Sequence, residues 1–484
     1  MSTEIRQLEP IALWKNFADL NAVPRASKKE ERVIEFAKQF GEKLGLETFV
    51  DEVGNVIIKK PASKGMEGKT TVVMQSHLDM VHQKNADTNF DFDTEGIKML
   101  IDGDWVRADG TTLGADNGIG VAAIMAVLES TDIAHPPIEA LFTIDEETGM
   151  TGAMGLKGGL LDGKIMLNLD TEDDHELTIG CAGGIDVSAS GTYNADTLPA
   201  NHTTFKISLT GLTGGHSGMD IHLGRGNANK LMNRFLFDVN KQLDIHIHSI
   251  DGGSLRNAIP RESFCVVAVA NNDVAKLKNK IAAYSKVLKE EYGTTDAEVQ
   301  FEMVEENEVT QVIPADLQNN LLRSIYACPN GIYRMSPDIE DLVQTSNNLA
   351  RVLLKDGKYE VLCLTRSSVD SEKKDEVNAI TSTFEMMGAK VTAEGGYPGW
   401  APKPGSNIVK LMSELYTEMF GENADVNACH AGLECGILGT NYPEMEMISF
   451  GPNIRGAHSP DEKAQISSVQ KFWGYLVATL GRIE

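Results

Sequence analysis

Short apolar runs along the chain are followed by polar residues of types that bind ligands. The runs at 71–75, 140–144 and 165–169 each have the pattern of a buried strand, and a histidine or carboxylate follows each within three residues. A fourth run, at 445–450, precedes an irregular loop that holds His458. Because ligands bind beyond the carboxyl ends of strands in open α/β sheets, the pattern predicts one site built from separate strand ends.

The first part of the chain alternates between helical and strand patterns. Residues 27–44 carry apolar side chains at helical spacing, and Ser27 and Glu30 have the spacing of a capping box at the start of that helix. The alternation continues to about residue 185, which indicates a doubly wound α/β sheet.

The middle of the chain, from about 186 to 402, has a different pattern. Its apolar periods predict two βαββαβ-like halves in tandem, which resemble a duplicated ferredoxin-like unit. Asp356-Gly357 joins two of the strands and is typical of a hairpin turn. The expected strands are 203–210, 244–250, 263–270, 297–304, 348–355, 359–365 and 390–395, and the expected helices are 225–241, 273–291, 315–327 and 369–387.

A tract rich in Pro and Gly at 398–405 marks a linker, after which the α/β pattern returns. His458 lies beyond this tract, so a site that unites it with His77 requires a discontinuous domain. We therefore expect residues 1–185 and 403–484 to form one domain, interrupted by a second domain at 186–402.

Composition narrows the class of protein. A chain of 484 residues suggests two or three domains, and its net charge of −26 opposes binding to nucleic acid or to an anionic membrane. We find neither the apolar core of a signal peptide at the N-terminus nor an uncharged apolar run of about 18 residues. Six cysteines without a CxxC pair indicate reduced core residues of a cytoplasmic enzyme, with a site-lining position as an alternative for Cys429 and Cys435.

The spacing of His77 and Asp79 suits metal binding. Two residues apart on extended backbone, they point to the same face. Asp79 is then able to accept the proton from the far ring nitrogen of His77 and fix the tautomer that ligates a metal. A surface hydrogen-bonded pair is the ordinary alternative for such a motif alone.

Asp116 lies in a Gly-rich segment, 114–120, that precedes an apolar helix. No Lys-Ser/Thr follows the glycines, which disfavours a phosphate loop. An aspartate at a helix start is also an ordinary N-cap. The glycines leave the backbone free to adopt an unusual geometry, which is consistent with an aspartate shared between two metals.

Glu146 and Glu147 are adjacent, so one carboxylate is able to bind metal while the other acts as general base toward a metal-bound water. A solvated acidic loop is an equal alternative for that pair in isolation. Asp170 and His458 also have ordinary alternatives, as a turn residue and as an exposed loop histidine. The joint order is more specific, because five residues indicate a two-metal hydrolase: His77, Asp116, Glu147, Asp170 and His458.

In these residues and the motifs around them, the chain resembles the M20 metallopeptidase family, and within it the bacterial aminoacyl-histidine dipeptidases. The resemblance covers essentially the whole length. Its motifs are Ser76-His77-Leu78-Asp79, Gly114-Ala115-Asp116-Asn117-Gly118, Asp145-Glu146-Glu147-Thr148-Gly149, Asn168-Leu169-Asp170-Thr171-Glu172, Gly214-Gly215-His216-Ser217-Gly218, Arg256-Asn257-Ala258-Ile259-Pro260 and Ala457-His458-Ser459-Pro460.

The resemblance implies a role for each residue of the centre. Glu146 is the implied general base and Asp79 the implied partner of His77, and the bond between Asp116 and Asn117 is implied to be cis. Mixed imidazole and carboxylate ligation suits Zn²⁺, with Mn²⁺ or Co²⁺ as alternatives. One ion is implied to take His77 and Asp170, and the other Glu147 and His458, with Asp116 between them.

The resemblance also implies the fold: a discontinuous α/β catalytic domain with a mixed sheet flanked by helices, and an inserted α+β lid of two ferredoxin-like halves. In the lid, His216 is the implied oxyanion donor, and Asn257 and Arg366 are candidates to hold the substrate carboxylate. Glu434 is a candidate to receive a free α-amino group. We expect a homodimer formed through the lid, and leave open whether His216 serves its own chain or its partner.

The expected function is hydrolysis of dipeptides, Xaa-His dipeptides included, by a metal-activated water. The alternatives within the family are an N-acyl-amino-acid deacylase, a carboxypeptidase and a tripeptidase. A non-hydrolytic peptide-binding relative is a further alternative, which Glu146 disfavours because binding requires no general base.

Overall fold

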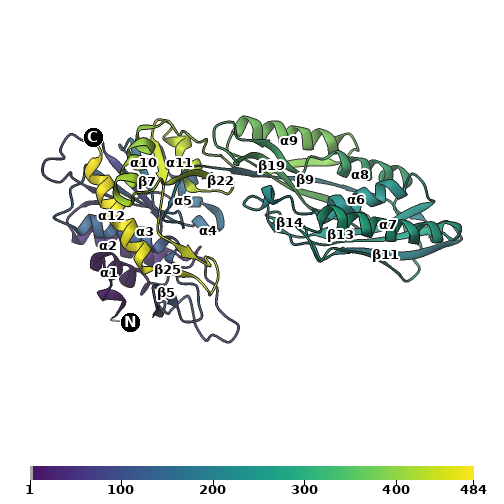
Figure 1. Ribbon diagram of the computed structural model, residues 1–484, viewed down its shortest axis with the longest axis horizontal. Coiled ribbons are helices and arrows are strands. Elements are labelled where there is room, and N and C mark those ends of the chain that lie inside the picture. The colour runs from purple at the N-terminus through teal and green to yellow at the C-terminus, as the bar shows by residue number, and fades with distance from the viewer. Residues whose placement is uncertain (1–3) are drawn as a thin grey trace. The chain divides into compact units, whose positions relative to one another are not determined.

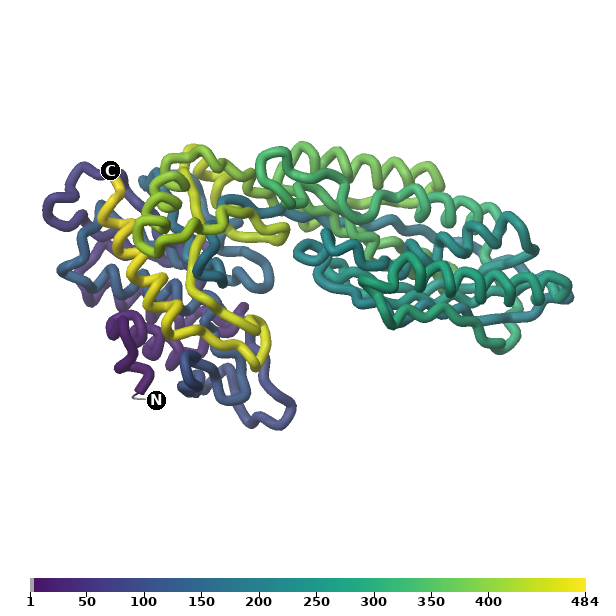
Figure 2. The backbone as a smooth tube through the Cα atoms, viewed as in Figure 1, coloured from purple at the N-terminus to yellow at the C-terminus, as the bar shows by residue number. Residues whose placement is uncertain are grey.

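The computed structural model describes residues 4–484, which form two compact units. Both ends of the described chain lie in the first unit, where early and late segments are intermixed (Figures 1 and 2). The first unit comprises the chain up to Gly180 with Trp400–Ala428 and Leu433–Glu484, and the second comprises Cys181–Gly399 with Cys429–Gly432.

An eight-stranded mixed sheet forms the centre of the first unit, in the order β1-β2-β6-β3-β7-β23-β8-β22. Strand β3 pairs in parallel with β6 and β7, and β7 with β23, whereas the pairs β1–β2, β2–β6 and β23–β8 are antiparallel. The strands are β1 (Glu47–Val50), β2 (Val56–Lys60), β3 (Val72–His77), β6 (Ile138–Thr143), β7 (Ile165–Asn168), β8 (Glu176–Cys181), β22 (Asp425–Cys429) and β23 (Glu446–Ser449).

Helices cover this sheet. Every residue of β3 and β6 is buried, as expected for central strands packed on both faces. A smaller sheet, ordered β24-β25-β5-β4, joins Ile454–Arg455, Lys463–Gln465, Trp105–Ala108 and Met99–Asp102. The helices are η1 (Ile5–Gln7), α1 (Ile11–Leu20), α2 (Glu31–Lys43), α3 (Ala115–Glu129), α4 (Glu146–Gly149), α5 (Thr151–Gly155), α10 (Asn407–Phe420), α11 (Glu434–Asn441) and α12 (Ile466–Arg482).

The capping box expected at the start of the first amphipathic helix is wrong. Helix α2 begins at Glu31, and Ser27 does not cap it; its hydroxyl donates to Oδ2 of Asp79 at 2.7 Å. The side chain of Glu30 accepts from the backbone N–H of Lys28 at 2.8 Å. As a cap, the hydroxyl would accept from a backbone N–H of the helix, whereas here it donates to a buried carboxylate, so a tertiary contact outweighs the local motif.

The second unit is built on a nine-stranded antiparallel sheet with the path β16-β11-β15-β13-β19-β20-β9-β21, to which β18 adds beside β19. The expected hairpin turn at Asp356-Gly357 is confirmed, since both residues have positive φ and join β19 to β20. The strands are β9 (Gly183–Thr192), β11 (His202–Thr210), β13 (Ile245–Gly253), β15 (Ser263–Ala270), β16 (Gln300–Glu305), β18 (Gly331–Met335), β19 (Val343–Lys355), β20 (Lys358–Ser367) and β21 (Lys390–Tyr397).

This sheet contains two ferredoxin-like halves, but they are nested and not in tandem. One half is continuous and runs from β11 to β16. The other takes β9 as its first strand and resumes with α8 (Ala315–Ala327), so the continuous half is inserted into it. The expected tandem order was wrong because no local feature of the 183–192 segment indicates which later strand it pairs with.

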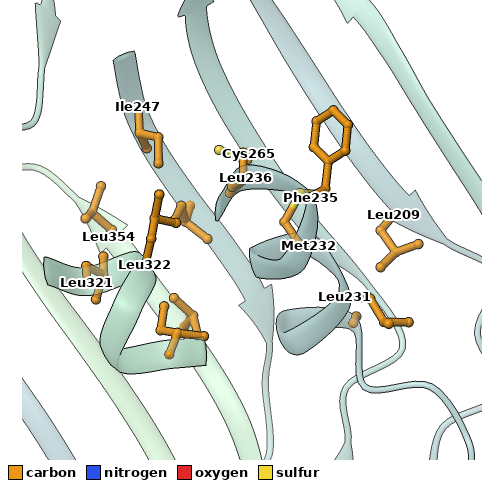
Figure 3. Packing of buried hydrophobic residues seen from close by; sticks show 14 of the residues in the cluster. Leu209, Leu231, Met232, Phe235, Leu236, Ile247, Cys265, Leu321, Leu322 and Leu354 are labelled. Atoms are coloured by element: carbon orange, nitrogen blue, oxygen red, sulfur yellow. The ribbon is translucent and has the colours of Figure 1, made fainter. Parts of the chain in front are cut away.

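The core of the second unit lies between the sheet and its helices. Side chains of α6 (Ala228–Val239) and α8 pack against side chains of the strands beneath them (Figure 3). Helices α7 (Val274–Tyr292) and α9 (Asp370–Glu385) contribute to the same cluster. Between the halves, β13 pairs with β19, so one continuous sheet supports both.

Within residues 4–484, no helix is both long enough and apolar enough to cross a membrane.

Candidate metal centre

The predicted ligands come from neighbouring strand ends of the first unit. Strands β6, β3 and β7 are adjacent and parallel, so their carboxyl ends share one edge of the sheet. His77 is the last residue of β3, Glu147 lies in α4 just beyond β6, and Asp170 lies two residues beyond β7. Asp116 is in the first turn of α3, and His458 lies in the loop between β24 and β25.

The structure brings all five side chains together, and Asp116 stands between two histidines. Its Oδ1 lies 3.2 Å from Nε2 of His77, and its Oδ2 lies 3.2 Å from Nε2 of His458. His77 Nε2 also lies 3.5 Å from Oδ1 of Asp170, and His458 Nε2 lies 3.0 Å from Oε2 of Glu147. Each half of the cluster thus pairs one histidine with one carboxylate.

The donor set fits two divalent metal ions. A tetrahedral zinc ion with bonds of 2.0–2.1 Å separates its ligand atoms by about 3.3 Å, close to the distances within each half of the cluster. Oε1 of Glu147 and Oδ1 of Asp170 are buried and lack a hydrogen-bond partner. Buried carboxylate oxygens are normally satisfied, and a bound cation would satisfy these.

The electrostatics of the cluster favour cations. Hydrogen bonds with Asp116 and Glu147 raise the pKa of His458 to about 11. Burial would raise the pKa of Asp116, but its contacts with His458 and His77 lower it well below the usual range. Carboxylates that hold a proton this tightly on a neighbouring histidine have a strongly negative potential, which attracts a metal ion as well.

Asp79 lies behind His77, as its spacing predicts. Its Oδ1 is 3.4 Å from Nδ1 of His77, and its carboxylate also accepts from the backbone N–H groups of Glu146 and Glu147 at 3.0 and 3.3 Å. Burial would raise the pKa of Asp79, but hydrogen bonds from His77 and Ser27 lower it to about 2. One ionised carboxylate therefore orients a histidine and the adjacent glutamate pair.

Glu146 is close to the cluster, and its environment increases the proton affinity of its carboxylate. One oxygen of Glu146 lies within 4.8 Å of ligand atoms of His77 and Glu147. Burial raises the pKa of Glu146 well above its usual value; His77 opposes this, while Asp170 and Glu434 add to it. A group with a raised pKa in such a position is suited to accept a proton.

Two residues that sequence reasoning missed hold the loop of Asp116. The carboxylate of Glu462 accepts from four consecutive backbone N–H groups, Leu113 to Asp116, at 2.7–3.2 Å. The buried Arg25 donates to the backbone oxygen of Gly114 in that loop, and also to the backbone oxygens of Leu78 and Asp79 at 3.0 Å. Proximity to His458 in sequence is the one signal for Glu462, and nothing local marks Arg25.

The peptide bond between Asp116 and Asn117 is cis, which confirms the bond implied by the family resemblance. Glu172 is a further carboxyl that sequence reasoning did not single out. Burial raises its pKa to about 8, with Asp116 and Asp170 contributing. Its place in the Asn168–Glu172 motif was the signal for it.

Glu434 is fully buried in the first unit, in the first turn of α11. Its Oε2 accepts from the amide of Gln75 and the hydroxyl of Thr143, both at 2.6 Å, while Oε1 lacks a partner. Burial raises the pKa of Glu434 to about 8, although His77 and the Thr143 hydrogen bond lower it.

His216 and Arg366 lie together in the second unit. Nδ1 of His216 accepts from the backbone N–H groups of Gly218 and Met219 at 3.2 and 3.0 Å, which leaves the ring proton on Nε2. That nitrogen lies 3.5 Å from Nη2 of Arg366. Burial and Arg366 lower the pKa of His216, so the neutral donor form is favoured. Two donors thus converge where an anionic group would be bound.

The surroundings of this pair include one predicted and one unpredicted residue. Asn257 is exposed; its backbone oxygen accepts from Ser217, and the strand that follows it pairs with the His216 strand. His430, which sequence reasoning missed, has Nε2 at 2.7 Å from the hydroxyl of Ser346. Burial and Arg366 lower its pKa to about 3.

None of the six cysteines forms a disulfide, as expected for reduced core residues. Cys435 is buried beside Glu434, and Cys429 is half-buried at the end of β22.

The model of peptidase family M20/M25/M40 matches residues 73–482, most of the chain. The chain belongs to the M20 peptidase family. Among relatives of this M20 peptidase, the cytosol non-specific dipeptidase of Escherichia coli (strain K12) is 43% identical over 481 residues, which are 99% of each chain.

Solved structures agree with that family. The crystal structure of an aminoacylhistidine dipeptidase from Vibrio alginolyticus matches this M20 peptidase with a TM-score of 0.94 and 45% identity, covering 100% of this chain and 98% of that one. The aminopeptidase PepT from Bacillus cereus matches with a TM-score of 0.56 and 16% identity over 98% of both chains, which shows a shared fold.

Proposed function

We propose that this M20 peptidase is a metallodipeptidase that hydrolyses the peptide bond of dipeptides, Xaa-His dipeptides included. The observation that carries the proposal is Asp116, whose two oxygens each face a different histidine–carboxylate pair. High identity to two whole-length dipeptidases supports a dipeptide substrate over an acylated amino acid or a longer peptide.

His77 and Asp170 would hold one metal ion, and Glu147 and His458 the other, with Asp116 shared. Bound there, two divalent ions supply an activated water and polarise the scissile carbonyl. Imidazole and carboxylate ligands favour Zn²⁺, with Mn²⁺ and Co²⁺ as alternatives. Asp79 would position His77 through the contact between its carboxylate and Nδ1 of the histidine ring.

Glu146 is the proposed general base. The raised pKa of Glu146 suits a carboxylate that takes the proton of the attacking water and returns it to the leaving amine. Its backbone is fixed by the hydrogen bond to Asp79, so the side chain starts from a defined position.

Recognition of the substrate is assigned to four residues. His216 would donate from Nε2 to the oxyanion, and Arg366 would bind the substrate carboxylate with its planar fork. Asn257 would assist Arg366. Glu434 would receive the free α-amino group through Oε1, the oxygen that lacks a hydrogen-bond partner among the described residues.

We further propose that residues 186–402 act as a lid, between catalytic segments 1–185 and 403–484, and that two chains form a homodimer through that lid. A cytoplasmic location is proposed from the reduced cysteines and from the cytosolic relative.

One metal-replete assay tests the function. We would compare an Xaa-His dipeptide, an N-acetylated amino acid and a tripeptide, each with and without a chelator. We expect the dipeptide to have the highest kcat/KM and a chelator to abolish turnover. Preference for the acetylated amino acid or the tripeptide would identify a deacylase or tripeptidase instead, and chelator-resistant turnover would contradict the metal mechanism.

A further inference from the structure

A second group of potential metal ligands lies on the sheet of the second unit. His202 is the first residue of β11, His246 is in β13, and Asp244 immediately precedes β13 (Figure 1). One ligand atom from each lies within 4.8 Å of the other two. None of these residues belongs to the centre around Asp116.

The register of the sheet brings the two histidines together. Strand β15 lies between β11 and β13, and it places Ala270 opposite His202 and Ala268 opposite His246. Opposed residues of antiparallel strands face the same side, so all four lie on one face. The two alanines leave room above β15, and the imidazole rings approach to 5.1 Å between centroids.

The carboxylate of Asp244 faces both rings. Its Oδ2 lies 3.4 Å from Nε2 of His202, and its Oδ1 lies 3.1 Å from Nε2 of His246. Ligand atoms of a tetrahedral zinc ion are separated by about 3.3 Å, so these spacings match a ligand set of two imidazoles and one carboxylate.

The tautomer of His202 indicates what the cluster binds. Its Nδ1 lies 3.1 Å from the backbone oxygens of Pro199 and Ala200, so the ring proton belongs on Nδ1. Nε2 then presents a lone pair to the oxygen of Asp244, which also carries lone pairs. The His202 side chain is 4% exposed, and its Nε2 is buried without a hydrogen-bond partner. A buried ring nitrogen with a lone pair that faces a carboxylate oxygen is stabilised by a cation between the two atoms.

We propose that His202, Asp244 and His246 form a third divalent-metal site, of the zinc class, outside the catalytic centre. The imidazole nitrogens select a borderline transition metal over Mg²⁺ or Ca²⁺. Asp244 is 60% exposed, so solvent reaches the site and is able to fill a fourth position. The ion links β11 to β13 across β15 and so stabilises the second unit.

Metal stoichiometry tests this site in the full-length enzyme. The wild type and the variants His246→Ala and Asp244→Asn would be equilibrated with Zn²⁺ at the same micromolar free concentration and analysed for bound metal. We expect each variant to bind one equivalent fewer than the wild type, with kcat/KM for a dipeptide unchanged. His248→Ala is the matched control, because His248 lies on the same strand with its Nδ1 on the backbone oxygen of Gln311.

Thermal unfolding gives a second measurement. We expect Zn²⁺ to raise the Tm of the wild type and of His248→Ala above that of the same protein with only its catalytic metals, and to leave the Tm of Asp244→Asn unchanged. Equal metal content in the wild type and both site variants would overturn the proposal.

Discussion

At the scale of the residue, the proposed metal centre depends on how Asp116 presents its two carboxylate oxygens. Glu462 holds four backbone N–H groups of the Asp116 loop, and Arg25 holds the strand end that carries Asp79. These contacts fix the backbone that carries Asp116 and Asp79. Preorganised ligands lose less conformational entropy on binding, which strengthens metal affinity.

Asp116→Ala is expected to lose tight binding of both catalytic ions, because the five ligands supply too few atoms for two independent four-coordinate sites. Metal analysis after dialysis against a weak chelator measures this. Two ions still bound tightly in the variant would show that Asp116 is not the shared ligand.

Glu146→Gln is expected to retain metal and fold while kcat falls by roughly 10²–10⁴-fold, the usual effect of losing an acid–base group. Gln keeps the size of the side chain and removes its basicity. Kinetics on a metal-loaded preparation, with metal content measured in parallel, provides the test. Near-normal turnover would place the base elsewhere.

His216→Ala is expected to lower kcat by roughly 10²–10³-fold and to raise KM less, because an oxyanion donor acts chiefly in the transition state. His222→Ala, at an exposed histidine of the same segment, is the matched control. A rise in KM with kcat unchanged would make His216 a substrate-binding residue only.

At the scale of the element, helix α9 contains a buried acidic side chain. Glu376 is fully buried, and neither of its carboxyl oxygens has a hydrogen-bond partner. Burial raises its pKa to about 8, with Cys363 and Glu372 contributing. The folded protein therefore keeps this carboxyl protonated over a range in which the unfolded chain releases the proton.

The sign of the pH effect follows from that difference. Between the ordinary carboxyl pKa of 4.5 and the folded value of about 8, the native state binds more protons than the unfolded state, so stability falls as pH rises. In the wild type, this group lowers the free energy of unfolding by up to about 1.4 kcal/mol for each pH unit of increase, and Glu376→Gln removes that dependence. Urea unfolding at about pH 5 and about pH 8 measures the effect, with the exposed Glu385→Gln of the same helix as control. Equal pH slopes in the wild type and Glu376→Gln would contradict it.

At the scale of the whole molecule, the second unit contains two ferredoxin-like halves where a single ferredoxin-like unit would have one. Its two nested halves share one sheet through the pairing of β13 with β19. In the proposed lid, one half would serve the substrate and another surface a second chain. This division of roles is the basis for the proposed dimer.

We expect the purified enzyme to be a dimer in solution. Deletion or charge substitution within the lid is expected to change the mass of the assembly without first changing its metal content. Light scattering coupled to size exclusion, with activity measured on the same fractions, tests this. A strictly monomeric and fully active enzyme would remove the dimer proposal.

The sequence predicted seven strands of the large sheet of the second unit but not β9 or β18, together with the hairpin at Asp356-Gly357 and the five clustered side chains, and the family resemblance implied the cis bond at Asp116. Apolar runs and turn residues are local signals for strands and turns, and the family motifs indicate which residues form the site. Tertiary structure alone decided the nesting of β9 with later strands, the hold of Glu462 on the Asp116 loop, and the transfer of Ser27 from a helix cap to Asp79. These features depend on contacts between residues far apart in the chain. A local sequence pattern does not indicate the energies of such contacts.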